Sequence, residues 1–118
     1  MPPPPPCCTA HSPAQNGNGL TYHDPQTGAP IVKLSTFPDF KAMNDYAHSL
    51  GLTSGWYGNN CICSDHCSTD ECYAADVAAT IAYGFDSTKL DGCGAQRDLQ
   101  KFWDLFTATG KSIMVENW

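Results

Sequence analysis

Apolar residues recur at helical spacing in three stretches of the chain, and a short strand-like run follows each stretch. The first stretch predicts a helix that begins after Pro38 and ends at Gly51, because proline favours a helix start and glycine a helix end. The apolar face of this helix consists of Phe40, Met43, Ala47 and Leu50, at positions i, i+3, i+7 and i+10. We expect this face to be buried.

The second and third helical patterns lie further along the chain. The second covers Thr69–Tyr83 and ends at Gly84, and the third begins near Gln96 and ends at Gly110. Their apolar stripes are Ala74, Val77, Ala78 and Ile81 in the second helix and Leu99, Phe102, Trp103 and Phe106 in the third. Each stripe marks the side of its helix that we expect to be buried.

The strand candidates are Leu52–Tyr57, Ser87–Leu90 and Ser112–Glu116, so the predicted order is αβαβαβ. Strands separated by helices cannot pair as hairpins, and we expect parallel neighbours joined by right-handed crossovers. The fold class is therefore α/β, as part of either a doubly wound sheet or a (β/α)₈ TIM barrel. A complete barrel needs about 250 residues, so in a barrel these strands form a partial one of about three βα units.

The N-terminal segment differs in composition from the rest of the chain. Residues 1–30 hold most of the prolines and an NGNG turn cluster at 16–19. The run Pro2–Pro6 favours the polyproline II conformation, which some aromatic grooves bind. We predict an irregular proline-rich segment over 1–30 and a folded domain over 31–118.

Charge and cysteine content narrow the possible functions. The 118 residues carry a formal net charge of −6, which disfavours nucleic-acid binding, and no apolar run approaches the roughly 20 residues of a membrane-spanning helix. Seven cysteines favour an oxidising compartment, although Met1 is followed by prolines rather than by a secretory signal. We expect a parent protein of the secretory pathway, either extracellular or lysosomal or vacuolar.

Four cysteines and a histidine form a dense cluster in the loop before the second helix: Cys61, Cys63, His66, Cys67 and Cys72. Zinc sites pair cysteines two to four residues apart, twice, across a longer spacer, and this cluster is more compressed. A disulfide is the favoured alternative, with Cys93 available as a partner outside the cluster. A metal site in a reducing setting stays open.

The carboxyl ends of the predicted strands carry polar side chains, and both candidate architectures place function at this edge. Asp91 follows the strand Ser87–Leu90, and Lys89 lies two residues earlier on the same face of that strand. An ammonium beside a carboxylate keeps the acid ionised, which suits a nucleophile. A structural ion pair or a helix cap is the alternative role.

Two motifs in this part of the chain resemble α-galactosidases of glycoside hydrolase family 27. Residues 37–43 read FPDFKAM and residues 46–57 read YAHSLGLTSGWY, which resembles the third helix–strand region of that family. Residues 83–93 read YGFDSTKLDGC and resemble its Gly-x-Asp-x-x-Lys-x-Asp-x-Cys segment. With the last predicted strand, the resemblance covers residues 31–118.

The resemblance implies a role for individual residues. Asp91 matches the nucleophile that forms the covalent glycosyl-enzyme intermediate, and Lys89 and Tyr57 match residues of the sugar pocket. Cys93 matches a cysteine at the substrate site that is bridged to the preceding loop, and Cys63 is the partner we expect. The family implies a carbohydrate partner, and we expect no cofactor, no metal, no nucleic acid and no membrane.

Retaining glycosidases use a second carboxylic acid about 5–5.5 Å from the nucleophile. In the family this acid lies on a later strand, which has no match here. We therefore expect a hydrolase that releases terminal α-linked galactose, present as a fragment that is inactive alone. N-acetylgalactosaminides are the nearest alternative substrates. A small cysteine-rich metal-binding or interaction module is the alternative from a different functional class.

Overall fold

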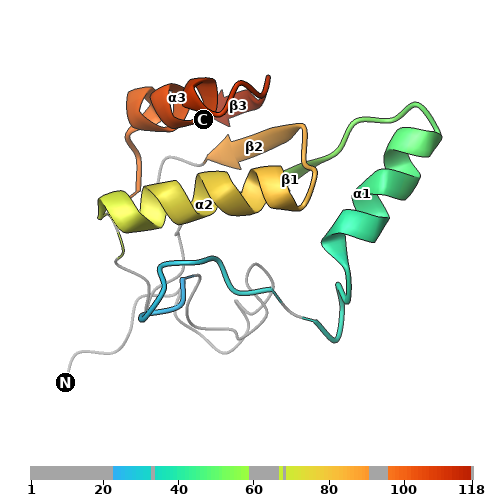
Figure 1. The fold of residues 1–118 in the computed structure, drawn as a ribbon, viewed down its shortest axis with the longest axis horizontal. Helices are drawn as coiled ribbons and strands as arrows, with labels where there is room; N and C mark the ends of the chain where they lie inside the picture. The colour runs from blue at the N-terminus through green and yellow to red at the C-terminus, as the bar shows by residue number, and fades with distance from the viewer. Residues whose placement is uncertain (1–22, 33, 59–66, 68, 91–95, 118) are drawn as a thin grey trace.

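A computed structural model of the chain describes residues 23–32, 34–58, 67, 69–90 and 96–117. Helices and strands alternate in it, as the sequence predicts (Figure 1). In chain order they are α1 (Phe40–Ser49), β1 (Gly55–Tyr57), α2 (Asp70–Ala82), β2 (Ser87–Leu90), α3 (Leu99–Ala108) and β3 (Met114–Asn117). None of the helices in these residues combines the length and the apolar character that a membrane span requires.

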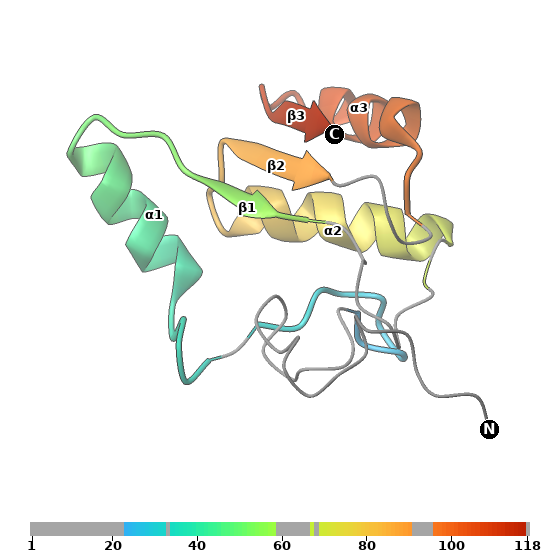
Figure 2. The same ribbon diagram turned by 180° about the vertical axis from the view of Figure 1, so that it is seen from behind.

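The strands form one parallel sheet in the order β1-β2-β3 (Figure 2). This confirms the α/β class and the expected parallel pairing. Tyr57 is in register with Lys89, and Lys89 is in register with Glu116. The sheet is compatible with part of a larger α/β fold, and within the described residues it does not close into a barrel.

Two strands are shorter than the sequence pattern predicts. β1 begins at Gly55 rather than Leu52, and β3 begins at Met114 rather than Ser112. The first residue of the central strand β2 is Ser87, and its register partners are Gly55 in β1 and Met114 in β3. The two outer strands therefore begin where their pairing with β2 begins. A side chain at Gly55 would collide with the Ser87 hydroxyl, so the close approach of β1 and β2 requires glycine at this position.

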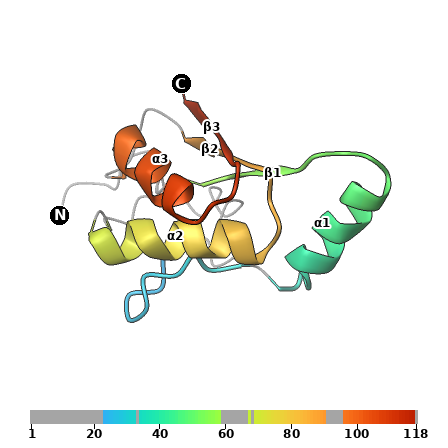
Figure 3. The same cartoon turned by 45° about the horizontal axis from the view of Figure 1, so that its top comes forward.

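The hydrophobic core lies between the sheet and the helices α2 and α3, which run side by side along one face of it (Figure 3). Its buried members are Tyr73, Val77, Leu90, Phe102 and Phe106. The rings of Tyr73 and Phe102 lie 4.8 Å apart and join the two helices. The core therefore fixes β2 in place through the alternate residues that face the helices.

The predicted apolar face of α1 is only partly right, because Phe40 and Ala47 are half-buried and Phe40 packs against Phe85. Met43 and Leu50 are 42% and 58% exposed, whereas Asn44 is completely buried. The Asn44 side chain donates a hydrogen bond of 2.7 Å to the Tyr83 carbonyl at the C-terminal end of α2. The buried side of α1 therefore runs through Phe40, Asn44 and Ala47, whereas Met43 and Leu50 are exposed.

The stripes of α2 and α3 are only partly as predicted. Val77, Phe102 and Phe106 are buried, but Ala74, Ala78 and Trp103 are exposed. The second buried side of α2 consists instead of Cys72, Asp76 and Thr80. These side chains are spaced four residues apart and make polar or covalent contacts, which hydrophobic periodicity does not detect.

Asp86 and a group of aromatic rings connect α1 to the sheet. The rings of Trp56 and Phe85 stack with centroids 4.9 Å apart, and Phe40 of α1 lies against Phe85 at 5.2 Å. The Asp86 carboxylate accepts a hydrogen bond of 2.8 Å from the Ser54 amide and lies 2.7 Å from His48 Nε2. These contacts hold the start of β1 beside the start of β2.

Candidate functional site

The two faces of β2 carry different kinds of side chain. Thr88 and Leu90 are buried toward the helices, whereas Ser87 and Lys89 point to the opposite face of the sheet and are partly exposed. Since side chains alternate along a strand, the register places Tyr57, Lys89 and Glu116 in one row on this second face. In the part of the chain that the structure describes, no helix covers this face (Figure 2).

A shallow hollow of about 330 Å³ lies over this row. Its lining residues are Gly55, Trp56, Tyr57, Ser87, Lys89 and Glu116. The ammonium nitrogen of Lys89 lies 5.7 Å from the centroid of the Tyr57 ring, within the range of a cation–π contact. An aromatic ring, an ammonium and a carboxylate therefore surround one hollow at the carboxyl ends of three adjacent parallel strands.

The chain continues close to β2 beyond the end of β1. The Gly58 amide donates a hydrogen bond of 2.8 Å to the Lys89 carbonyl, which extends the pairing of the two strands. A side chain at Gly58 would collide with the Thr88 hydroxyl. A larger residue at this position would therefore require the Thr88 side chain to rotate.

The structure brings together two of the residues that the sequence assigns to the site, Tyr57 and Lys89. The predicted nucleophile Asp91 lies outside the described residues, and so do Cys63 and Cys93, the predicted disulfide pair. Glu116, to which the sequence analysis gave no role, adds a carboxylate to the same row. Its position depends on the register of β3 on β2, which no local pattern specifies.

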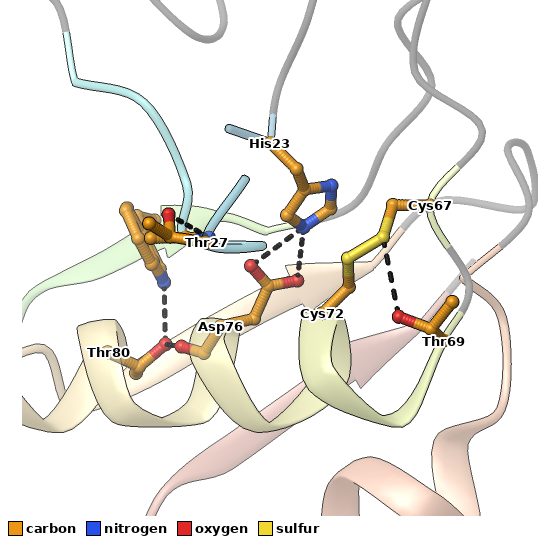
Figure 4. Close-up of polar contacts among 9 residues, drawn as sticks. His23, Thr27, Cys67, Thr69, Cys72, Asp76 and Thr80 are labelled. Carbon is orange, nitrogen blue, oxygen red and sulfur yellow. Dashed lines mark hydrogen bonds and ion pairs between the residues drawn. A yellow bond between two sulfur atoms is a disulfide. The ribbon is translucent and has the colours of Figure 1, made fainter. Parts of the chain in front are cut away.

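A second polar cluster lies on the far flank of α2, around His23 (Figure 4). The ring nitrogen Nε2 of His23 lies 2.9 and 3.0 Å from the two carboxylate oxygens of Asp76, and both side chains are buried. Beside them, Cys67 and Cys72 form a disulfide with a Cα–Cα distance of 6.2 Å. The expectation of a disulfide in the cysteine cluster is thus confirmed, and this bond joins two members of the cluster. The predicted bridge between Cys63 and Cys93 lies outside the described residues.

A tight turn positions His23 on α2. The Asp24 carboxylate accepts hydrogen bonds from the amides of Gln26 and Thr27, and His23 forms an antiparallel bridge with Pro30. Gly28 has a φ angle of +72°, and a side chain there would come within 3.3 Å of Cys72 Sγ. We call residues 23–30 the His23 hairpin, and it lies directly against the cysteine end of α2.

The flank of α2 that faces the hairpin is linked to the sheet. The Trp56 indole donates to the Thr80 hydroxyl at 3.0 Å, and that hydroxyl donates to the Asp76 carbonyl at 2.8 Å. Sequence reasoning missed His23 and Asp76 because they are 53 positions apart. The spacing of Cys72, Asp76 and Thr80 at i, i+4 and i+8 is the one local signal of a polar buried face.

A scan against protein-family models finds no matching family, and searches among curated proteins and among solved structures find no match either. The assignment of a function therefore depends on the residues and their geometry.

Proposed function

We propose that the chain is part of a retaining glycoside hydrolase that releases terminal α-linked galactose, and that the hollow over Tyr57, Lys89 and Glu116 belongs to its sugar site. The observation that carries the proposal is the position of Tyr57 beside Lys89 at the carboxyl ends of neighbouring parallel strands. Ligands bind at this edge in both the barrel and the doubly wound architectures.

The groups in the row suit a polyhydroxylated ligand. The ammonium group of Lys89 can donate hydrogen bonds to sugar hydroxyls, and the carboxylate of Glu116 can accept hydrogen bonds from them. The ring of Tyr57 supplies an apolar surface against which the carbon side of a sugar ring can pack, and its hydroxyl supplies a polar edge. The hollow thus combines hydrogen bonding with apolar contact.

The nucleophile in this proposal is Asp91, the residue after the end of β2. Its carboxylate attacks the anomeric carbon, the bond to the leaving oxygen breaks, and a covalent glycosyl-enzyme intermediate forms. The positive charge of Lys89 two residues earlier favours the ionised carboxylate that this attack requires. Support for this role comes from the resemblance of residues 83–93 to the family segment and from the place of Lys89 in the row.

Completion of the cycle needs a second carboxylic acid, which protonates the leaving oxygen and later activates water. The resemblance places it on a later strand of a longer parent protein of the secretory pathway, with a bridge between Cys63 and Cys93 beside the nucleophile. In this proposal the family resemblance gives a terminal α-galactoside as the substrate. N-acetylgalactosaminides are the alternative, and turnover rates on a panel of both substrates distinguish them.

The test is an assay with a chromogenic α-galactoside. We expect little turnover by the 118-residue chain, and turnover by a longer parent chain that falls by about 10³-fold or more in Asp91→Asn. The matched control is Asp45→Asn, which removes an exposed carboxylate on α1 and should leave turnover unchanged. An active parent chain that is indifferent to Asp91→Asn would refute the nucleophile assignment.

A further inference from the structure

The buried cluster beside the His23 hairpin holds three side chains that bind metals well. The ligand atoms of His23, Cys67 and Cys72 all lie within 4.8 Å of one another. His23 is 4% exposed and Cys72 is 2% exposed, whereas Cys67 is partly exposed at the edge of the cluster. None of these residues takes part in the proposed sugar site on the other face of the sheet.

The composition of the cluster suits zinc. Zinc in proteins prefers thiolate sulfur and imidazole nitrogen in tetrahedral geometry, with bonds of about 2.0–2.3 Å that place the ligand atoms about 3.3–3.8 Å apart. From the observed limit of 4.8 Å, the histidine nitrogen has to approach the sulfurs by about 1 Å. The two sulfurs are bonded to each other in the disulfide, and they have to separate by about 1.5 Å once that bond is reduced. Cys67 and Cys72 are separated by four residues, within the range that zinc-binding cysteine pairs use.

Asp76 is placed to orient the histidine. Both of its carboxylate oxygens contact Nε2 of His23, at 2.9 and 3.0 Å, and Figure 4 shows the carboxylate between the ring and the axis of α2. In zinc sites the histidine ligand commonly donates its second N–H to a carboxylate, which fixes the tautomer and the ring plane. Because Asp76 contacts Nε2, the metal ligand in such a pair is the other ring nitrogen of His23, Nδ1.

We propose that reduction of the Cys67–Cys72 disulfide converts this cluster into a zinc site with His23, Cys67 and Cys72 as ligands and Asp76 as the positioning residue. In the reductive step a dithiol transfers two electrons and two protons to the disulfide, which yields two cysteine thiols and the oxidised, cyclic form of the dithiol. Zinc binding then displaces the two thiol protons, and water occupies the fourth coordination position.

The disulfide and the zinc site exclude each other, because metal coordination requires thiolates. In the oxidised form the bond joins Cys67 only to Cys72, at the start of α2. In the zinc form the metal also links His23 to α2, so that the His23 hairpin is held to the helix by coordination bonds. The state of the two thiols thereby controls how firmly residues 23–30 are attached.

Cobalt(II) is the probe for the test, because its spectrum reports thiolate ligands. The 118-residue chain is reduced with a water-soluble phosphine under anaerobic conditions, and the phosphine is then removed. The reduced chain is titrated first with cobalt and then with zinc. We expect one equivalent of cobalt to give a thiolate charge-transfer band that zinc abolishes, and no such band in the oxidised chain. His23→Asn, Cys67→Ser and Cys72→Ser should each weaken binding by at least about 10-fold.

Matched controls separate this site from other thiols and histidines. Cys8→Ser and His48→Asn remove a cysteine and a histidine to which the proposal gives no role, and they should leave the titration unchanged. Asp76→Asn should weaken zinc binding by about 10–100-fold and alter the cobalt spectrum, and Asp76→Glu should partly restore both. A purely structural role of Asp76 would change stability without changing the spectrum.

Alkylation mapping keeps the proposal testable where a variant does not fold. In the reduced wild-type chain, one equivalent of zinc should protect Cys67 and Cys72 from iodoacetamide, as read by peptide mass spectrometry. Protection of other cysteines with Cys67 and Cys72 still modified would overturn the proposal, as would equal affinity in His23→Asn or in the oxidised chain. This test involves no galactoside, so its failure would leave the proposed glycosidase activity unaffected. Failure of the glycosidase assay would likewise leave the proposed zinc site unaffected.

Discussion

The molecule has polar groups in two regions that differ in how those groups are paired and exposed. In the row on the open face of the sheet, Tyr57, Lys89 and Glu116 surround a hollow and belong to separate strands. On the far flank of α2, His23 and Asp76 are buried against one another. The first arrangement leaves polar groups around a partly exposed hollow, whereas the second uses them to join the His23 hairpin to the helix.

This difference predicts that substitutions in one region mainly change ligand binding, whereas substitutions in the other mainly change folding stability. Changes on the open face should alter ligand binding with little loss of folding stability, because their side chains bury few apolar atoms. Changes in the His23 cluster should lower the free energy of unfolding, because they leave a buried polar group without its partner.

The largest loss of stability is expected for His23→Ala. The substitution removes one member of a buried pair and leaves Asp76, which is only 2% exposed, without its histidine partner. Loss of one partner of a buried pair lowers the free energy of unfolding by about 3–5 kcal/mol. The matched variant is His48→Ala, whose pair with Asp86 is 39% and 38% exposed and for which we expect about 0–1 kcal/mol. Urea unfolding of both variants measures the difference, and equal losses would contradict the distinction between the regions.

The second largest contrast lies within β2, between its two faces. Leu90→Ala leaves a cavity in the core beside Phe102 and should cost about 2–5 kcal/mol. Lys89→Ala, one position earlier on the open face, should change stability by about 0.5 kcal/mol or less. Thermal unfolding of the two variants tests the assignment of faces. A large loss in Lys89→Ala would show that the lysine has a structural role instead of a binding role.

The smallest effect concerns Asp86 and depends on pH. The Ser54 amide and the His48 side chain hold the pKa of Asp86 below its ordinary value. The resulting stabilisation is present above the pKa of an unfolded aspartate, about 3.9, and is lost as the pH falls through the lower folded value. Asp86→Asn should therefore cost about 1 kcal/mol at pH 7, a value that allows for its partial exposure. This cost should shrink below about pH 4. A pH-independent difference between the two proteins would contradict this cause.

The sequence predicts the order of helices and strands, the parallel sheet and the helix ends at Gly51, Gly84 and Gly110, each of which has a positive φ angle. These features are local, or follow from the rule that strands separated by helices pair in parallel. The family resemblance also implies that Tyr57 and Lys89 lie in one pocket, and the register of β1 on β2 pairs these two residues.

Features that depend on distant partners escaped prediction. Asn44 of α1 is buried where its amide meets the Tyr83 carbonyl, 39 residues away, and the apolar pattern of α1 does not indicate this contact. The His23–Asp76 pair spans 53 residues, and the Cys67–Cys72 bond required a choice among several cysteines at similar spacing. In each case the physical cause is a specific polar or covalent partner, which hydrophobic periodicity does not encode.

Covalent labelling tests whether the row of Tyr57, Lys89 and Glu116 belongs to a sugar site whose nucleophile is Asp91. A fluorinated α-galactosyl fluoride reacts with the nucleophile of a retaining enzyme as the bond to fluoride breaks, and fluoride leaves without help from a general acid. The labelling therefore does not depend on the second carboxylic acid. It is carried out on the 118-residue chain and on a longer parent chain, with peptide mass spectrometry as the readout. We predict a galactosyl adduct on Asp91 that is absent from Asp91→Asn and reduced in Lys89→Ala. An adduct on another carboxylate, or no adduct in either chain, would contradict the account.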